Sequence, residues 1–152
     1  MVVKGFTLIE LVSVMAVMAI LAAMAAPRMM GTETFATRGD SGLILSGLRY
    51  AQKIALTQHR TIYVRVNPVS NNLSLCYSAT CDTFLQDPVT GGNFSVGLDR
   101  NVQISTTQTT LGFLSDGTPS PSSGAEYVIT NKKSTSQTFT IKVEPGTGYV
   151  HK

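Results

Sequence analysis

The chain has 152 residues, which is enough for one domain with its own core but not for two. Its formal net charge is only +3, and its basic residues never form a run longer than two. This pattern excludes the strongly basic stripe that is typical of dedicated nucleic-acid-binding proteins. Apolar residues gather near the N-terminus, and the remainder is rich in Thr, Ser, Asn and Gly. The sequence therefore predicts a hydrophobic anchor followed by a polar, strand-rich domain.

An apolar run follows Glu10 and extends to Pro27. Ser13 is the only polar residue within it. Three structures suit such a run: a secretory signal peptide cleaved after Ala25, a membrane-spanning helix from Phe6 to Ala26, and a buried core helix. The run is too long for a signal peptide, and the rest of the chain is too small to surround a helix that is apolar on all sides. None of the three explains the carboxylate of Glu10.

Glu10 lies four residues after Phe6, so the two share one face of a helix. A carboxylate in the hydrocarbon of a membrane is costly unless it has a partner. Cleavage between Gly5 and Phe6 would create an amine that pairs with Glu10, in the same chain or in a neighbouring one. In the second case Glu10 is a residue of filament assembly.

The segment Lys4-Gly5-Phe6-Thr7-Leu8-Ile9-Glu10, followed by the apolar run, resembles the class III signal of type IV pilins and type II secretion pseudopilins. The resemblance implies that a prepilin peptidase cleaves after Gly5 and that the new N-terminal residue, Phe6, is methylated. It implies that Glu10 pairs with the N-terminus of a neighbouring subunit. It also implies a single-pass protein of the bacterial inner membrane, which an inner-membrane assembly platform moves into a periplasmic or cell-surface filament.

Pro27 ends the apolar run, and a proline inside a helix removes a backbone hydrogen bond and kinks the preceding turn. Many pilins carry a proline at this place, so the resemblance implies a helix kink at Pro27; the simpler alternative is that Pro27 ends the membrane segment. The predicted organisation is a leader peptide over residues 1–5, a hydrophobic transmembrane or assembly helix over residues 6–30, and an extracytoplasmic domain over residues 31–152.

A second, amphipathic helix is predicted from residue 28 to about residue 58. Its apolar residues recur at spacings of three and four and form a face that packs on a sheet: Leu43, Ile44, Leu48, Ala51, Ile54 and Ala55. On the other faces, we expect Arg49, Gln52 and Lys53 to lie in water. Glycines weaken this helix, and a break near Gly31, or between Gly39 and Gly42, is an alternative.

Alternating apolar and polar residues predict strands over residues 61–67, 73–77, 82–85, 102–105, 111–114, 127–130, 138–143 and 149–151. In the segment 138–143, Phe139, Ile141 and Val143 face the core. Residues 115–124 are rich in Ser, Pro and Gly and predict an exposed, mobile loop. The predicted fold class is α+β: a long N-terminal helix, transmembrane in its first half and amphipathic in its second, packs on a small antiparallel β-sheet domain, which is the pilin fold.

Cys76 and Cys81 are the two cysteines of the chain. No second pair of Cys or His accompanies them, so neither a metal site nor a cofactor is predicted. An export segment upstream implies an oxidising compartment and favours a disulfide over two free thiols. So short a loop stabilises the fold by about 2 kcal/mol.

The chain carries no motif for a nucleophile, a zinc protease or a phosphate-binding loop, and its two histidines, His59 and His151, lie far apart in sequence. It is therefore not predicted to be an enzyme. Segments 45–55, 111–117 and 148–150 resemble the GspH/FimT branch of minor pilins and pseudopilins. Members of that branch tend to be scarce initiating or tip subunits, which implies a minor role.

Some FimT-like pilins bind DNA through a C-terminal Gly-Arg-x-Arg motif, but the arginines are missing here. The candidate DNA contacts are Lys132, Lys133, Lys142, His151 and Lys152. Ordinary solvated charges are the favoured interpretation of these residues, and DNA is not the favoured partner.

The predicted function is that of a minor pilin-like structural subunit of a type IV pilus or related filament, with other pilin or pseudopilin subunits as partners. Such a subunit helps filament initiation, tip assembly or surface interaction. The alternatives are a DNA-binding minor pilin for DNA uptake and a minor pseudopilin of type II secretion.

Overall fold

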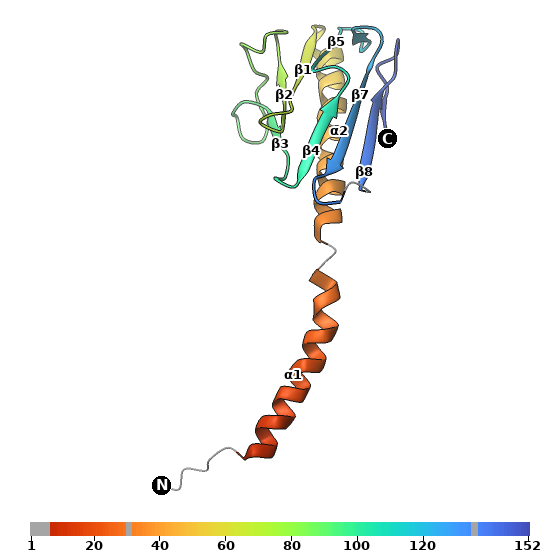
Figure 1. Cartoon of the computed structure of the whole chain (residues 1–152). Coiled ribbons are helices and arrows are strands. Elements are labelled where there is room, and N and C mark those ends of the chain that lie inside the picture. The colour runs from red at the N-terminus through yellow and green to blue at the C-terminus, as the bar shows by residue number, and fades with distance from the viewer. Residues whose placement is uncertain (1–6, 30–31, 135–136) are drawn as a thin grey trace. The chain divides into compact units, whose positions relative to one another are not determined.

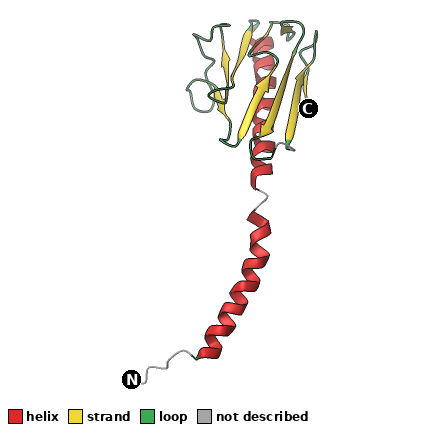
Figure 2. Cartoon of the chain, viewed as in Figure 1, coloured by secondary structure: helices red, strands yellow, loops and turns green. Residues whose placement is uncertain are grey.

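The computed structural model describes residues 7–29, 32–134 and 137–152. The chain divides into two compact units, Met1–Glu33 and Thr34–Lys152. Helix α1 (Leu8–Met29) belongs to the first unit, whereas the second contains nearly all of helix α2 (Thr32–Gln58) and all of the strands (Figures 1 and 2). The predicted leader and Phe6 lie outside the described residues.

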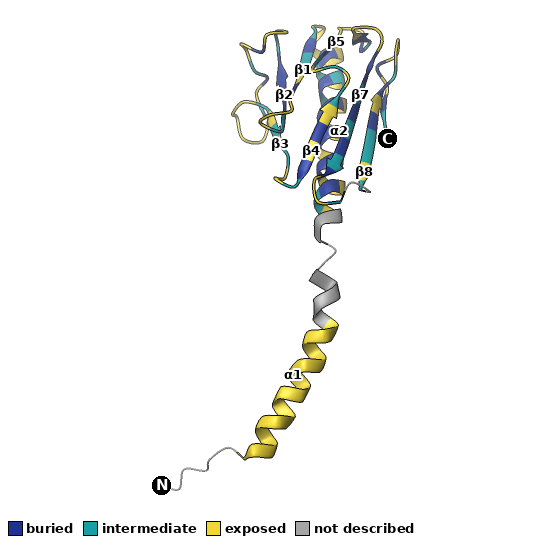
Figure 3. Cartoon of the chain, viewed as in Figure 1, coloured by how far each residue is buried: buried dark blue, intermediate teal, exposed yellow. Residues whose placement is uncertain are grey.

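Helix α1 is apolar on all of its faces, and every described side chain from Thr7 to Met24 is exposed (Figure 3). The helical backbone continues through Pro27 and ends at Met29. The kink at Pro27 stays a prediction. Within the described residues, no helix combines the length and the hydropathy that crossing a membrane requires.

Helix α2 runs without interruption through Gly39, Gly42 and Gly47. The predicted break between Gly39 and Gly42 is therefore wrong, whereas the alternative at Gly31 falls outside the described residues. The helix persists because its buried face, which includes Ile44 and Leu48, packs on the strands. Tertiary packing of this kind outweighs the cost of about 1 kcal/mol for each helical glycine.

The strands are β1 (Ile62–Asn67), β2 (Asn72–Cys76), β3 (Ser95–Gly97), β4 (Val102–Thr106), β5 (Thr110–Phe113), β6 (Pro119–Ser120), β7 (Ala125–Asn131), β8 (Thr138–Val143) and β9 (Val150–His151). They form two antiparallel sheets, in agreement with the predicted antiparallel β-sheet domain. One sheet has the order β3-β2-β1-β5-β6 and the other has the order β4-β7-β8-β9. The division arises at β4, which lies between β3 and β5 in sequence but pairs with β7, from Val102 opposite Asn131 to Thr106 opposite Tyr127.

The core lies between α2 and the two sheets (Figure 3). Strand β1 buries Ile62, Val64 and Val66 and turns the intervening side chains outward, as its alternation predicts. Strand β7 alternates in the same way, from Ala125 to Asn131. Every residue of the buried cluster belongs to Thr34–Lys152, so this unit contains a complete hydrophobic core.

Two predicted segments differ from the structure. Residues 82–85 contribute an isolated bridge, Phe84 opposite Cys76, instead of a strand. Residues 115–124 are not a free loop, because they contain β6, which pairs with β5 through Ser120 opposite Gly112. Pro119 and Gly117 are buried as a result.

Arg49 and Gln52 of α2 do not simply lie in water. The Arg49 guanidinium donates two hydrogen bonds to the carbonyl of Val150, with donor–acceptor distances of 3.2 and 3.0 Å. The Gln52 amide donates to the carbonyls of Gly117 at 3.0 Å and Thr147 at 3.3 Å. Gln52 thus connects the turns that precede β6 and β9 to the helix, and Arg49 connects the first residue of β9 to it. Lys53 is exposed, as predicted.

Candidate functional site: the N-terminal motif and the C-terminal edge

Glu10 lies in the first turn of α1 and is exposed. The Thr7 hydroxyl donates to Glu10 Oε2 and also accepts the backbone N–H of Glu10, each at 3.4 Å. The Thr7 carbonyl accepts the N–H groups of Glu10 and Leu11, which begins the helix. A threonine followed three residues later by glutamate is the spacing of a capping box, and a carboxylate near the first turn also interacts favourably with the helix dipole.

This local role leaves most of the hydrogen-bonding capacity of Glu10 unused. Among the described residues, only the weak Thr7 bond engages its carboxylate, and a carboxylate accepts several donors. An amine brought close to Glu10 would find an accessible partner there. Gly5 and Phe6, which the sequence assigns to cleavage and methylation, lie outside the described residues.

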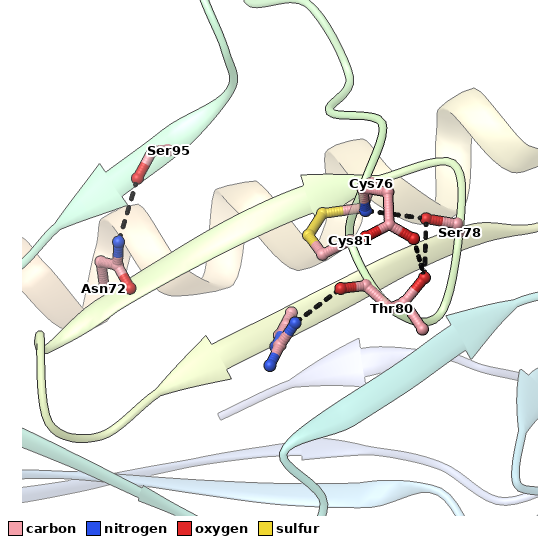
Figure 4. The surroundings of a disulfide bond; sticks show 8 residues. Asn72, Cys76, Ser78, Thr80, Cys81 and Ser95 are labelled. Carbon is pink, nitrogen blue, oxygen red and sulfur yellow. Dashed lines mark hydrogen bonds between the residues drawn. A yellow bond between two sulfur atoms is a disulfide. The ribbon is translucent and has the colours of Figure 1, made fainter.

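Cys76 and Cys81 form the disulfide that the sequence predicted, with 5.1 Å between their Cα atoms (Figure 4). Cys76 ends β2, and hydrogen bonds hold the loop between the two cysteines. Arg65 donates to the Thr80 carbonyl at 2.7 Å, and the Ser78 hydroxyl accepts the N–H of Asp82 at 3.0 Å. The disulfide therefore fixes the direction in which the chain leaves the sheet.

The five candidate DNA contacts lie in the turn after β7, on β8 and β9, and at the C-terminus. Lys132 and Lys133 follow β7 in the turn to β8, and the Lys132 ammonium donates to the carbonyl of Arg100 at 2.9 Å. The ammonium of Lys152 donates to the Ser41 hydroxyl of α2 at 2.8 Å and lies 4.8 Å from the centre of the Phe139 ring.

Lys142 and His151 lie side by side on β8 and β9, but carboxylates accompany them. Glu126 is the cross-strand neighbour of Lys142 on β7, and Glu144 Oε1 is 2.7 Å from His151 Nε2. This mixture of charges weakens the field that would attract a phosphate. The hydrogen bond that His151 donates to the Glu144 carboxylate raises the pKa of His151 above its ordinary value, and the Lys152 carbonyl raises it further, whereas the charge of Lys142 lowers it.

Both the N-terminal segment and the fold of the chain resemble those of known proteins. Residues 1–26 match the family model described as the prokaryotic N-terminal methylation motif. The fold resembles the type IV minor pilin FimU of Pseudomonas aeruginosa, with a TM-score of 0.60 and 17% identity over 79% of this chain and 90% of that one. It also resembles the minor pseudopilin EpsH of the type II secretion system of Vibrio cholerae, with a TM-score of 0.59 and 14% identity over 76% of this chain and 94% of that one. The chain therefore resembles type IV pilins in its N-terminal motif and in its fold. No curated protein sequence matches it.

The two comparisons describe different parts of the pilin-like chain. The motif covers the signal and most of the apolar run, and it is typical of membrane-anchored pilins. The solved structures give the fold alone at these identities. FimU is a type IV minor pilin and EpsH is a minor pseudopilin of a type II secretion system, so the fold does not distinguish these two kinds of protein.

Sequence reasoning missed a polar stripe on the pilin-like chain's second helix. Thr37, Asp40 and Ser41 are buried, one turn before the apolar face begins at Ile44. The Asp40 carboxylate accepts the backbone N–H of Asp99 at 2.8 Å, and burial raises the pKa of Asp40. The spacing of three and four that continues from Ile44 back through Ser41, Asp40 and Thr37 is the signal that would have found it.

The stripe attaches the beginning of α2 to three distant parts of the chain. Asn131 of β7 donates to the Thr37 hydroxyl at 3.0 Å, the backbone at Asp99 binds Asp40, and Lys152 binds Ser41. Within the described residues, no group of His, Cys, Asp and Glu side chains is arranged to hold a metal ion. The polar groups of the pilin-like chain thus serve to join its elements.

Proposed function

We propose that this pilin-like chain is a minor structural subunit of a type IV pilus or a related filament, where it helps initiation, tip assembly or surface interaction. One observation carries the proposal: the methylation motif stands at the beginning of a helix whose apolar side chains are all exposed from Leu8 to Met24. A helix that is apolar on every face is buried in a lipid bilayer or among other helices in its working state. Neighbouring pilin or pseudopilin subunits supply those helices.

The proposed life cycle begins in the bacterial inner membrane, where α1 anchors the precursor. A prepilin peptidase cleaves after Gly5, Phe6 is methylated, and an assembly platform moves the subunit into a periplasmic or cell-surface filament. There Glu10 pairs with the N-terminal amine of a neighbouring subunit, and Pro27 kinks the helix where it leaves the membrane segment.

Intact mass spectrometry tests the processing steps. The chain is expressed with a prepilin peptidase, and in a matched strain that carries a catalytically dead peptidase. With active enzyme, we expect a mass equal to the chain from Phe6 onward plus one methyl group. A chain that begins at Ala26 in both strains would instead show ordinary signal-peptide cleavage and would overturn the proposal.

Substitution of Glu10 tests the assembly step. We expect Glu10→Ala and Glu10→Gln to leave cleavage intact but to lower incorporation into filaments by about tenfold or more, because each leaves the amine of a neighbour unpaired in an apolar environment. Quantitative immunoblotting of sheared filaments measures this.

Thr7→Ala is the matched control for Glu10, because it removes the cap of α1 and keeps the carboxylate. A lost cap costs about 1 kcal/mol of helix stability. Incorporation that falls equally in Thr7→Ala and Glu10→Gln would assign Glu10 to helix capping. Normal incorporation of the Glu10 variants would remove its assembly role altogether.

The second candidate is a minor pseudopilin of type II secretion, which the likeness to EpsH favours as much as the likeness to FimU favours a pilus. Both candidates share the fold and the processing. Deletion of the gene distinguishes them, because the first predicts a loss of surface pili and the second a loss of exported protein from the medium.

A further inference from the structure

A groove of about 650 Å³ lies between the C-terminal half of α2 and the chain segment that follows the disulfide. Its aromatic lining comes from Tyr50 of α2, Tyr77 and Phe84. Its polar lining includes Gln58 at the end of α2, and Gln86 beside Phe84. The volume falls within the range of about 300–1,000 Å³ that is typical of small-molecule sites.

The aromatic rings of the groove are held in place. Tyr50 stacks on Phe94 with 5.3 Å between ring centres, and the Arg60 guanidinium lies 4.0 Å from the centre of the Tyr77 ring. The opposite wall is fixed by the Cys76–Cys81 disulfide and by the bridge between Cys76 and Phe84. The groove is therefore formed before any ligand arrives, which lowers the entropic cost of binding.

Some polar groups that line the groove already make hydrogen bonds within the chain, and others do not. Within the part of the chain that the structure describes, the hydroxyls of Tyr50 and Tyr77 and the side-chain amides of Gln58 and Gln86 make no hydrogen bond. Asp87, in contrast, accepts the N–H of Val89 and the hydroxyl of Thr90, each at 2.9 Å. Its carboxylate is thus occupied by its own loop, which also lowers the pKa of Asp87.

This lining selects a class of ligand. Among the described residues, no Lys or Arg lines the groove, and the nearby Arg60 guanidinium lies against the Tyr77 ring, so the lining has little to offer a phosphate or a nucleic acid. Among the described lining residues, the one carboxylate is that of Asp87, and it already accepts hydrogen bonds from its own loop. A basic peptide therefore finds no ion-pair partner there. Amides and hydroxyls beside half-buried aromatic rings suit a molecule with many hydroxyls and apolar C–H faces. We propose that the groove binds a short, neutral oligosaccharide.

The proposal goes beyond the structural role and does not depend on which filament the chain enters. Sugar hydroxyls would exchange hydrogen bonds with Gln58, Gln86 and the tyrosine hydroxyls, while a sugar ring packs on Tyr77 or Tyr50. The site would give a filament subunit a means of contacting a polysaccharide surface.

The experiment uses the full chain in a zwitterionic detergent without a sugar headgroup. The probes are chitotetraose, cellotetraose and maltotetraose, and binding is measured by saturation-transfer NMR and calorimetry. We expect saturable binding of at least one probe at millimolar or lower concentration. Tyr77→Ala should weaken this binding by about tenfold, and Gln58→Ala by about threefold.

Tyr149→Ala is the matched control, because Tyr149 is an exposed tyrosine outside the groove, and its affinity should equal that of the unaltered chain. Gln58 is exposed at the helix end, so its variant keeps the test valid if Tyr77→Ala fails to fold. Absence of saturable binding for all three sugars overturns the proposal. Equal losses in Tyr149→Ala and Gln58→Ala also overturn it, as does saturable binding of an aromatic peptide with none of the sugars.

Discussion

At the scale of single residues, Tyr127 is the most unusual member of the core. It is fully buried on β7, and among the described residues its hydroxyl has no hydrogen-bond partner. Burial raises the pKa of Tyr127 well above its ordinary value of 10. A buried hydroxyl without a partner costs about 1–3 kcal/mol, so this residue is retained for the volume of its ring.

Tyr127→Phe should therefore increase the free energy of unfolding, by about 1 kcal/mol, because it removes the unpaired hydroxyl and keeps the ring. Tyr127→Ala is the control, and it should lower stability by about 3–5 kcal/mol through the cavity it leaves. Urea unfolding followed by circular dichroism measures both. A loss of stability in Tyr127→Phe would show that the hydroxyl has a partner, such as a buried water.

His151 gives the C-terminal edge a dependence on pH. The pKa of His151 is raised from 6.5, first by the hydrogen bond that its ring donates to Glu144, so the folded chain favours the protonated ring. The stabilisation is complete below the pKa of the unfolded chain and disappears as the pH rises through the higher pKa of the folded chain. The difference in melting temperature between the unaltered chain and Glu144→Gln should be largest between about pH 5 and 6.5 and should vanish once His151 is neutral. A difference that grows above pH 7 would contradict this assignment.

The N-terminal methylation motif could be recognised from the sequence because its signal is local. Gly5, Phe6 and Glu10 lie within one short motif, and Thr7 completes a cap at a spacing that the sequence displays. The role of Asp40 was not predictable with the same ease, because its partner is the backbone of Asp99, which lies far along the chain. Burial of a carboxylate depends on that distant contact.

At the scale of the elements, alanine substitutions at the glycines of α2 measure how much these residues lower the stability of the helix. A Cβ added at Gly39 or Gly42 meets nothing within 4 Å. Gly39→Ala and Gly42→Ala should each raise stability by about 1 kcal/mol, because alanine loses less backbone entropy in a helix. Thermal unfolding by circular dichroism measures this.

Gly148→Ala is the opposite case and serves as the control. Gly148 has a φ of 68°, and a Cβ there would approach the Gly117 carbonyl oxygen to 2.2 Å. We expect a loss of about 2 kcal/mol or more, since both the backbone conformation and the contact become unfavourable. Destabilisation by Gly39→Ala as well would mean that the beginning of α2 needs the flexibility of glycine.

Most elements were predicted because their apolar residues have a clear period, as in β1, β7 and α2. The missed strands, β3 and β6, have three and two residues and contain Gly, Ser and Pro. They exist because a longer neighbour supplies hydrogen bonds, β2 for Ser95 and β5 for Ser120. The order of the strands could not be predicted for a related reason: alternation shows which side chains are buried but not which strand lies beside which.

At the scale of the whole molecule, the complete core within Thr34–Lys152 predicts that this unit folds without α1. The fragment should unfold cooperatively, with a melting temperature within a few degrees of the full chain. A fragment that begins at Ile44 lacks Thr37, Asp40 and Ser41 and should be less stable by about 3 kcal/mol, since one buried and two partly buried hydrogen bonds are lost. Equal stability of the two fragments would show that the polar stripe contributes nothing to the attachment of α2.

The division into two units also determines which part of the chain its intrinsic fluorescence can monitor. It has five tyrosines and no tryptophan, and all five tyrosines lie in Thr34–Lys152. The intrinsic ultraviolet fluorescence therefore comes from this unit alone, and insertion or packing of α1 has no intrinsic emission of its own. A single tryptophan at Met15, which is exposed on α1, would supply an emission from the apolar helix that separates cleanly from the tyrosine signal of the folded domain.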